Sequence, residues 1–222
     1  MVFFEKSQPA PLCLETEKLK ASGTYNCGEV LERLKTDFKN KCYICENKGI
    51  TSINIEHFIP HEGHVGLKFD WNNLFYACAH CNNIKLAKYK NIINCCDPDS
   101  KVNERLRYDF VPFPYEHVSI QPLDLEKDTI ETAKLLNEVY QGTTKMKTIE
   151  SSNLRDKVLD EVIEFQTLLR DYFKADDNEM LKEQILPKIV GHLMKSSHFT
   201  AIKRDKILNN DKLKTQFSQY FD

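Results

Sequence analysis

The sequence predicts an α+β protein that is mostly helical, and three observations support this prediction. Two Cys-x-x-Cys pairs, at 42/45 and 78/81, bracket a segment whose apolar residues alternate as they do in strands. A short segment with helical character follows the second pair. Beyond about residue 129, apolar residues recur three and four positions apart in four successive segments. We therefore expect a strand, loop, strand, helix unit joined by the cysteines, followed by a helical C-terminal region.

Each segment of the first unit carries its own signal. Residues 28–38 have the apolar spacing of an amphipathic helix, and we expect this helix to pack against the first cysteine pair. Residues 52–59 alternate in character, which predicts a strand that ends before a proline. Residues 61–68 contain two glycines and are expected to form a loop. Residues 74–78 predict a second short strand, and residues 83–91 a helix.

The flanking regions complete the expected organisation. Residues 1 to about 27 carry two prolines, a glycine and little periodicity, which predicts a loosely structured lead-in. We divide the chain into a lead-in and helix (1–40), the strand and helix unit (41–108) and a helical region (109–222). A loop region with three prolines is expected before the first long helix. The predicted long helices are 129–140, 152–173, 178–194 and 200–208, and Pro187 is expected to kink or split the third.

The two cysteine pairs have the spacing of a zinc site. Zn²⁺ takes four sulfur ligands at about 2.3 Å in a tetrahedron, and one Cys-x-x-Cys turn places two sulfurs on the same ion. The predicted ligands of a structural Zn²⁺ are Cys42, Cys45, Cys78 and Cys81. Four unrelated core cysteines are the less favoured alternative, because paired spacing is more informative than cysteine number. His80 lies inside the second pair, but as a ligand it would disturb an already complete set.

Four cysteines lie outside these pairs. Eight cysteines in total are compatible with a secreted disulfide scaffold. The missing signal peptide and the paired spacings instead favour metal binding in a reducing compartment. We therefore expect small buried thiols at the four remaining positions, with a second metal site as the less favoured alternative. These positions are Cys13, Cys27, Cys95 and Cys96.

Composition limits the classes of function. With 222 residues, 41% of them apolar, the chain can bury a substantial core. No segment approaches the length and apolarity of a membrane span, so we expect a soluble, cytoplasmic protein. The formal net charge of −2 does not indicate a nucleic-acid partner, so any DNA contact must be local. Lys85, Lys88 and Lys90 are candidates for that contact, although a solvated helix face explains them about equally well.

A carboxylate, an imidazole and an amide lie in or beside the bracketed segment: Glu56, His57 and Asn82. Hydrolysis of a phosphodiester needs a base to activate water and a cation to offset charge in the transition state. His57 can act as the base, because a neutral imidazole prevails at pH 7. Glu56 and Asn82 offer oxygen ligands that suit Mg²⁺ or Mn²⁺. Neighbours on a strand point to opposite faces, so Glu56 and His57 can serve one phosphate only if the strand ends or bulges there.

Four motifs occur in order over about residues 40–90. They are Cys42-Tyr43-Ile44-Cys45, Glu56-His57-Phe58-Ile59-Pro60, Trp71-Asn72-Asn73-Leu74 and Cys78-Ala79-His80-Cys81-Asn82-Asn83-Ile84-Lys85. Together they resemble the zinc-containing HNH endonuclease family. The resemblance implies a one-metal mechanism in which His57 is the general base and Asn73 braces the catalytic loop. It also implies that Glu56 and Asn82 hold the catalytic metal ion.

Two positions depart from the commonest pattern of that family. Glu56 replaces an aspartate, which lengthens the side chain by one methylene, and Asn82 replaces the final histidine. Asn72 and Asn83 are the less favoured alternatives at the two asparagine positions. Asn73 is preferred because it precedes the leucine of the second strand, and Asn82 because it follows the last cysteine, as in the family pattern.

The layout of the whole chain is also similar to the HNH subunits of Septu-type anti-phage systems and related retron modules. The shared features are an N-terminal unit with Glu-His-Phe, Asp97-Pro98, and Thr132-Ala133-Lys134-Leu135-Leu136-Asn137 in the tail. This similarity implies pairing with an ABC-type ATPase and action on phage or foreign DNA. Two other functions stay open: a free-standing, restriction-like HNH endonuclease, and a non-catalytic zinc module that binds nucleic acid. The sequence does not distinguish DNA from RNA as the target.

Overall fold

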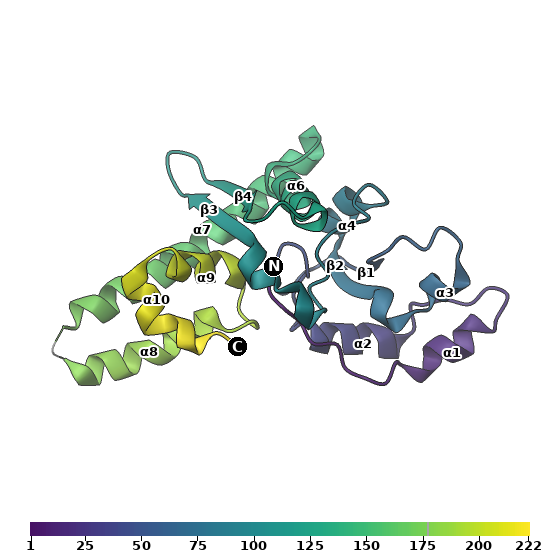
Figure 1. Cartoon of the computed structure of the whole chain (residues 1–222), viewed down its shortest axis with the longest axis horizontal. Helices are drawn as coiled ribbons and strands as arrows, with labels where there is room; N and C mark the ends of the chain where they lie inside the picture. Colours follow the sequence, from purple (N-terminus) through teal and green to yellow (C-terminus); the bar gives the residue numbers. More distant parts are fainter. Residues whose placement is uncertain (177) are drawn as a thin grey trace.

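The computed structural model describes residues 1–176 and 178–222, and its elements are mostly helices with two small antiparallel sheets (Figure 1). Helices α1 to α3 lie at one end of the long axis and α8 to α10 at the other (Figure 1). The elements in chain order are α1 (Leu12–Lys18), α2 (Gly28–Asp37), β1 (Ile53–His57), α3 (Val65–Lys68), β2 (Leu74–Cys78), α4 (Ala79–Lys85), α5 (Val102–Arg105), β3 (Leu106–Val111), β4 (His117–Pro122), α6 (Lys127–Gln141), α7 (Lys145–Lys174), α8 (Glu179–Leu193), α9 (Thr200–Leu208) and α10 (Asp211–Phe217).

The predicted strand, loop, strand, helix unit is present and is built from β1, β2 and α4. Strands β1 and β2 pair antiparallel, with Ile53 opposite Cys78 and His57 opposite Leu74. Every residue of β2 is buried, because α2 packs on this strand. The ring of Phe38, just after α2, lies 5.5 Å from the ring of Phe75 in β2. The ring of Phe38 also lies 6.3 Å from the ring of Tyr43, inside the first cysteine pair, which confirms the expected contact of residues 28–38 with that pair.

Two local predictions in this unit differ from the structure. Helix α4 begins at Ala79 inside the second cysteine pair, because the Sγ atom of Cys78 caps the helix by accepting the backbone N–H of Cys81 at 3.4 Å. It ends at Lys85, where Leu86 adopts a positive φ of 41°. The predicted bounds of this helix, 83–91, are therefore wrong, because the helix covers Ala79–Lys85. The segment predicted as a loop, 61–68, contains the short helix α3.

The N-terminal lead-in is ordered, contrary to the prediction. Met1, Val2 and Phe4 are buried in the main core, and the backbone N–H of Phe4 donates to the carbonyl of Cys95 at 2.9 Å. The segment also contains α1. Its apolar residues are too few to show periodicity, yet enough to anchor the chain once a preformed surface is present. Loose structure was therefore the wrong expectation for residues 1–27.

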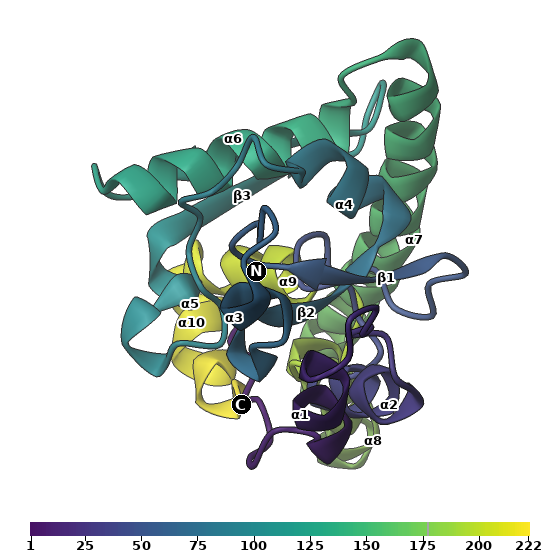
Figure 2. The same cartoon turned by 90° about the vertical axis from the view of Figure 1, so that its right-hand side faces the viewer.

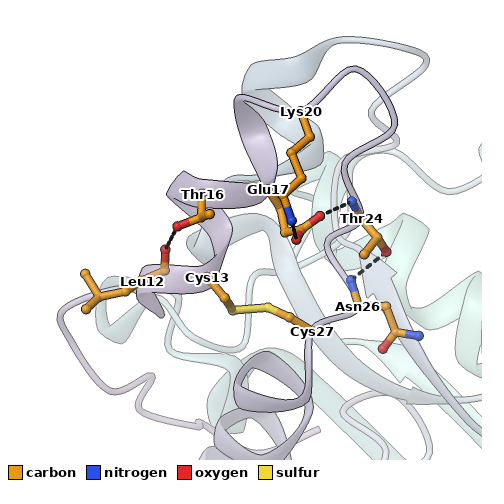
Figure 3. Close-up of a disulfide and its surroundings, with 8 residues drawn as sticks. All are labelled: Leu12, Cys13, Thr16, Glu17, Lys20, Thr24, Asn26 and Cys27. Carbon is orange, nitrogen blue, oxygen red and sulfur yellow. Dashed lines mark hydrogen bonds and ion pairs between the residues drawn. A yellow bond between two sulfur atoms is a disulfide. The ribbon is translucent and has the colours of Figure 1, made fainter.

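Two cysteines predicted as free thiols are joined. The Sγ atoms of Cys13 and Cys27 form a disulfide that connects α1 to the residue before α2 (Figure 3). Both side chains are half-buried rather than enclosed in the core. Cys13 and Cys27 are not spaced as a Cys-x-x-Cys pair, so the sequence did not indicate this pairing. Cys95 and Cys96 are free, the first buried and the second half-buried.

Residues 106–122 form a β-hairpin where a loop region was expected. Strands β3 and β4 pair antiparallel from Leu106 opposite Pro122 to Val111 opposite His117. The side chain of Asn137 on α6 fastens this hairpin, because its amide accepts from the N–H and donates to the carbonyl of Ile120 at 3.0 and 2.7 Å. Two of the prolines lie in the turn between the strands, where their missing N–H groups cost nothing.

The helical C-terminal region has the four predicted helices, as α6 to α9, and a further short helix, α10. Helix α8 is continuous through Pro187, so the proline does not split it. One buried apolar cluster extends from Met1 to Ile202. It includes the unit of β1, β2 and α4, called the finger below, the β3–β4 hairpin, α6, and α7 as far as Val162. A second cluster lies among α7 to α10. Helix α4 packs beside α6 (Figure 2), so the finger shares its core with the tail. None of the described helices is long and apolar enough to cross a membrane.

Candidate active site

The four predicted zinc ligands converge at the base of the finger. Their Sγ atoms all lie within 4.8 Å of one another, and all four residues are buried. Two come from the turn before β1, one from the end of β2 and one from the first turn of α4. The Sγ atoms of Cys45 and Cys78 are 3.9 Å apart. This separation is close to the edge of about 3.8 Å expected for a tetrahedron of sulfurs 2.3 Å from Zn²⁺. The donor set fits a structural metal ion.

His80 is turned away from this metal site. Its Nδ1 atom lies 2.6 Å from Oε2 of Glu150 on α7, and its Nε2 atom lies 2.8 Å from the carbonyl oxygen of Val139 on α6. Both ring nitrogens are therefore engaged by tail helices. The hydroxyl of Tyr140 donates to the carbonyl of Cys45 at 3.1 Å, which is a second link between tail and cysteine turn. His80 thus fastens the finger to α6 and α7.

The imidazole of His57, at the end of β1, has a defined tautomer. Its Nε2 atom lies 3.1 Å from the carbonyl oxygen of Lys68. A carbonyl can only accept, so Nε2 carries the proton and Nδ1 keeps its lone pair. Burial lowers the pKa of His57 from its ordinary value, so the ring is neutral at pH 7. His57 has the protonation state that a general base requires.

Asn73 fastens the loop between the two strands. It is only 4% exposed. Its Nδ2 donates to the carbonyls of Ile59 and Leu67 at 2.9 and 3.0 Å, and its Oδ1 accepts the N–H of Ile59 at 2.7 Å. One side chain therefore joins both ends of the loop that follows His57. Asn72, the alternative at this position, is exposed and accepts a hydrogen bond from Gln8 at 3.1 Å.

Replacing Asn73 by alanine is expected to lower the free energy of unfolding by about 2–3 kcal/mol, because three part-buried hydrogen bonds to the backbone of the loop are lost. Urea unfolding of the zinc-loaded protein measures this change. Asn72→Ala is the matched control on an exposed neighbour, expected within about 0.5 kcal/mol of the parent. Equal stability of the two variants would show that Asn73 does not brace the loop.

Glu56 is buried and has a partner on each oxygen. Its Oε1 lies 2.5 Å from Nζ of Lys85, and its Oε2 accepts from the hydroxyl of Tyr43 at 2.6 Å. Burial raises the pKa of Glu56, whereas the Lys85 ammonium and the Tyr43 hydroxyl oppose that rise. Strand β1 pairs regularly with β2 and ends at His57. Of the two conditions that the sequence left open, a strand end or a bulge, the structure has the strand end.

Lys85 corrects a prediction. Its side chain is fully buried, and Nζ donates to Glu56 and to the carbonyls of His57 and Phe58, at 3.2 and 2.8 Å. It cannot contact a phosphate in this arrangement, because all three of its N–H groups point into the protein. Lys88 and Lys90 are exposed but paired, with Glu138 and with Glu62 respectively. The phosphate contact of these two lysines stays a prediction.

Glu56, His57 and Asn82 line one open depression of about 290 Å³. Its other lining residues are Pro60, His61, Glu62 and Leu86. Each oxygen of Glu56 keeps a lone pair beyond its present hydrogen bond, and the Asn82 amide is half-exposed at the start of α4. A carboxylate oxygen and an amide oxygen are donors that Mg²⁺ or Mn²⁺ accepts. The donor types present therefore suit such an ion, with the Glu56 carboxylate held by Lys85 and Tyr43 in this arrangement.

Several residues of this site were not identified from the sequence. Tyr43 and Lys85 hold Glu56, and the rings of Tyr25 and His61 lie 4.5 and 4.6 Å from the ring of His57. Tyr43 does lie inside the first cysteine pair, which is a weak positional signal. For Tyr25 the sequence has no signal, since it lies in a segment without periodicity.

A two-stranded ribbon and a helix around a four-cysteine metal site, with a neutral histidine at the strand end, define a ββα-metal finger of nuclease type. Residues 42–88 match the protein-family model described as HNH endonuclease. No match was found among curated proteins. The matched segment contains all four cysteines and every residue predicted as catalytic. The match supports a nuclease of the HNH type.

Proposed function

We propose that this chain is a metal-dependent HNH endonuclease that hydrolyses phosphodiester bonds in DNA. The supporting observation is the imidazole of His57, which is neutral, has its Nε2 bonded to a backbone carbonyl, and lines the same depression as Glu56 and Asn82. A non-catalytic zinc module would not need a base and two oxygen donors at one opening. The cysteine site has a full set of ligands, so it is a poor candidate for the chemistry itself.

In the proposed mechanism, Nδ1 of His57 takes a proton from the attacking water. The Nε2–H group of the resulting imidazolium still donates to the carbonyl of Lys68. This hydrogen bond stabilises the new positive charge without movement of the ring. Asn73 holds the loop that follows His57. Glu56 and Asn82 would hold a Mg²⁺ or Mn²⁺ ion, which when bound would neutralise negative charge in the transition state.

Cleavage of supercoiled plasmid is expected to depend on added Mg²⁺ or Mn²⁺, because a zinc ion in the cysteine site would have all its ligands and could not replace the catalytic ion. The protein is dialysed against a mild chelator, and its zinc content is measured before the assay. Protein that retains zinc should be inactive without added metal and recover on addition of Mg²⁺. Zinc-loaded protein that cuts equally well without added metal would contradict the proposal. Cleavage of labelled RNA but not DNA would contradict the DNA assignment.

We further propose that the nuclease acts in anti-phage defence, together with an ABC-type ATPase. Three features support this proposal. The layout is similar to that of Septu-type HNH subunits, and the net charge of −2 gives the chain alone little affinity for DNA. The chain also has exposed apolar side chains. Phe113 and Tyr115, in the β3–β4 turn, are 70% and 83% exposed. Co-expression with the neighbouring gene product and size-exclusion chromatography test the pairing. A monomer with full activity and no retained partner would favour the free-standing endonuclease.

A further inference from the structure

The segment that connects α1 to α2, residues 19–27, reaches His57. The ring of Tyr25 meets the imidazole edge to face, with centroids 4.5 Å apart and an interplanar angle of 79°. In addition, Nζ of Lys68 donates to the carbonyl of Gly23 at 2.8 Å. The carbonyl of the same Lys68 holds Nε2 of His57. The connecting segment therefore contacts the imidazole directly and contacts the residue that sets its tautomer.

This segment is closed into a loop by a disulfide and local hydrogen bonds (Figure 3). The Cys13–Cys27 disulfide joins its end to α1. The carboxylate of Glu17 accepts the N–H of Thr24 at 3.0 Å and pairs with Lys20. A Cβ at Gly23 would lie 1.8 Å from the carbonyl oxygen of Glu17, so only glycine allows the chain to pass this close to α1. The loop from Cys13 to Cys27 thus has several independent restraints.

An imidazole can rotate about its Cβ–Cγ bond, and this rotation would carry Nε2 away from the Lys68 carbonyl. The ring of Tyr25 occupies space beside the imidazole, and the ring of His61 contacts it as well, at 4.6 Å. Tyr25 is half-buried, on the surface of the main core rather than inside it. Its ring contact with another aromatic residue, among those described, is with His57.

We propose that the disulfide-closed loop of residues 13–27 is a positioning element of the nuclease site, with Tyr25 as the positioning residue that holds the ring of His57. This inference rests on the proposed role of His57 as the base. The loop lies outside residues 42–88, the segment that matches the HNH family model. A loosened imidazole would present its lone pair correctly for only part of the time, which lowers the rate of the chemical step more than substrate binding.

Kinetics of the full-length, zinc-loaded protein on a labelled DNA duplex test the proposal. Tyr25→Ala is expected to lower kcat about tenfold and leave KM within about twofold, whereas Tyr25→Phe keeps the ring and should stay within about twofold of the parent. Long-range ¹H–¹⁵N spectra of the His57 ring give a readout that does not depend on activity. They should show one tautomer, protonated at Nε2, in the parent and in Tyr25→Phe, and a mixture in Tyr25→Ala.

Two further variants address the loop without touching Tyr25. Lys68→Met removes the bond to Gly23 but keeps the backbone carbonyl, and the Cys13→Ser/Cys27→Ser pair opens the loop. Each should lower kcat about threefold and broaden the His57 signals. Cys96→Ser, a half-buried free cysteine, is the control and should match the parent.

Three results would overturn the proposal. The first is a single His57 tautomer and parental kcat in Tyr25→Ala. The second is a change in KM alone, which would make Tyr25 a DNA contact instead. The third is a Cys13→Ser/Cys27→Ser variant with the kcat and the His57 signals of the parent, which would show that the disulfide does not help to position His57. If the parent fails to cleave, or if His57→Ala cleaves normally, the proposed function fails instead. The tautomer spectra would still decide whether Tyr25 holds the ring.

Discussion

Replacing Cys78 by serine is expected to unfold the finger. A four-thiolate zinc site contributes on the order of 10 kcal/mol of apparent free energy to folding. This is comparable with the net stability of a whole domain, about 5–15 kcal/mol. Cys78 is also the residue where β2 passes into α4, so its loss releases the strand and the helix together. Circular dichroism and metal analysis check the result, with about one zinc per parent chain and less than that in the variant.

Cys96→Ser is the matched control for this experiment, because Cys96 is free and lies outside the metal site. It should change the free energy of unfolding by less than about 1 kcal/mol and keep the zinc content of the parent. A Cys78→Ser protein that lacks zinc and remains fully folded would contradict the structural role of the site.

His57→Ala is expected to lower the rate of DNA cleavage by roughly 10²–10⁴, which is the range for loss of a general base. DNA affinity should change little, because non-specific affinity comes chiefly from contacts with phosphates. The fold should be retained, since the side chain of His57 is only half-buried. Single-turnover cleavage and a filter-binding assay in Ca²⁺ separate the two effects.

His64→Ala provides the control, because His64 is an exposed imidazole in the same loop. It should cleave at a rate within about threefold of the parent. If His57→Ala also cuts as fast as the parent, the proposed base is wrong. A joint loss of binding and cleavage would instead indicate that His57 serves to contact DNA.

The structure changes how Glu56 must be tested. As a predicted metal ligand, Glu56 would ordinarily be tested by Glu56→Ala. The buried ion pair with Lys85 means that alanine would leave an ammonium in the core without its carboxylate, a strongly destabilising change. Glu56→Gln also removes the charge but keeps the shape and an oxygen that can accept from Lys85, so it should destabilise the protein less than Glu56→Ala and is the better test of metal binding.

The sequence by itself determined the parts of this protein that depend on local pattern. Strand β2 covers the five residues predicted, since a short run of apolar residues between turn signals leaves little choice of conformation. The helices α6 to α9 lie where the apolar spacing placed them. The four cysteines of the metal site were found because two Cys-x-x-Cys turns can satisfy one tetrahedral ion. Each strand, helix or Cys-x-x-Cys signal lies within a short stretch of sequence.

Only the tertiary structure decided which distant groups meet. Glu56 and Lys85 are 29 positions apart, and no periodicity indicates that a lysine after a cysteine pair is buried against that carboxylate. The same holds for the burial of Met1, Val2 and Phe4, the Cys13–Cys27 disulfide and the contact of Tyr25 with His57. Such contacts form when the assembled core supplies a surface for segments that have weak preferences of their own, and a single sequence does not encode that surface in any local pattern.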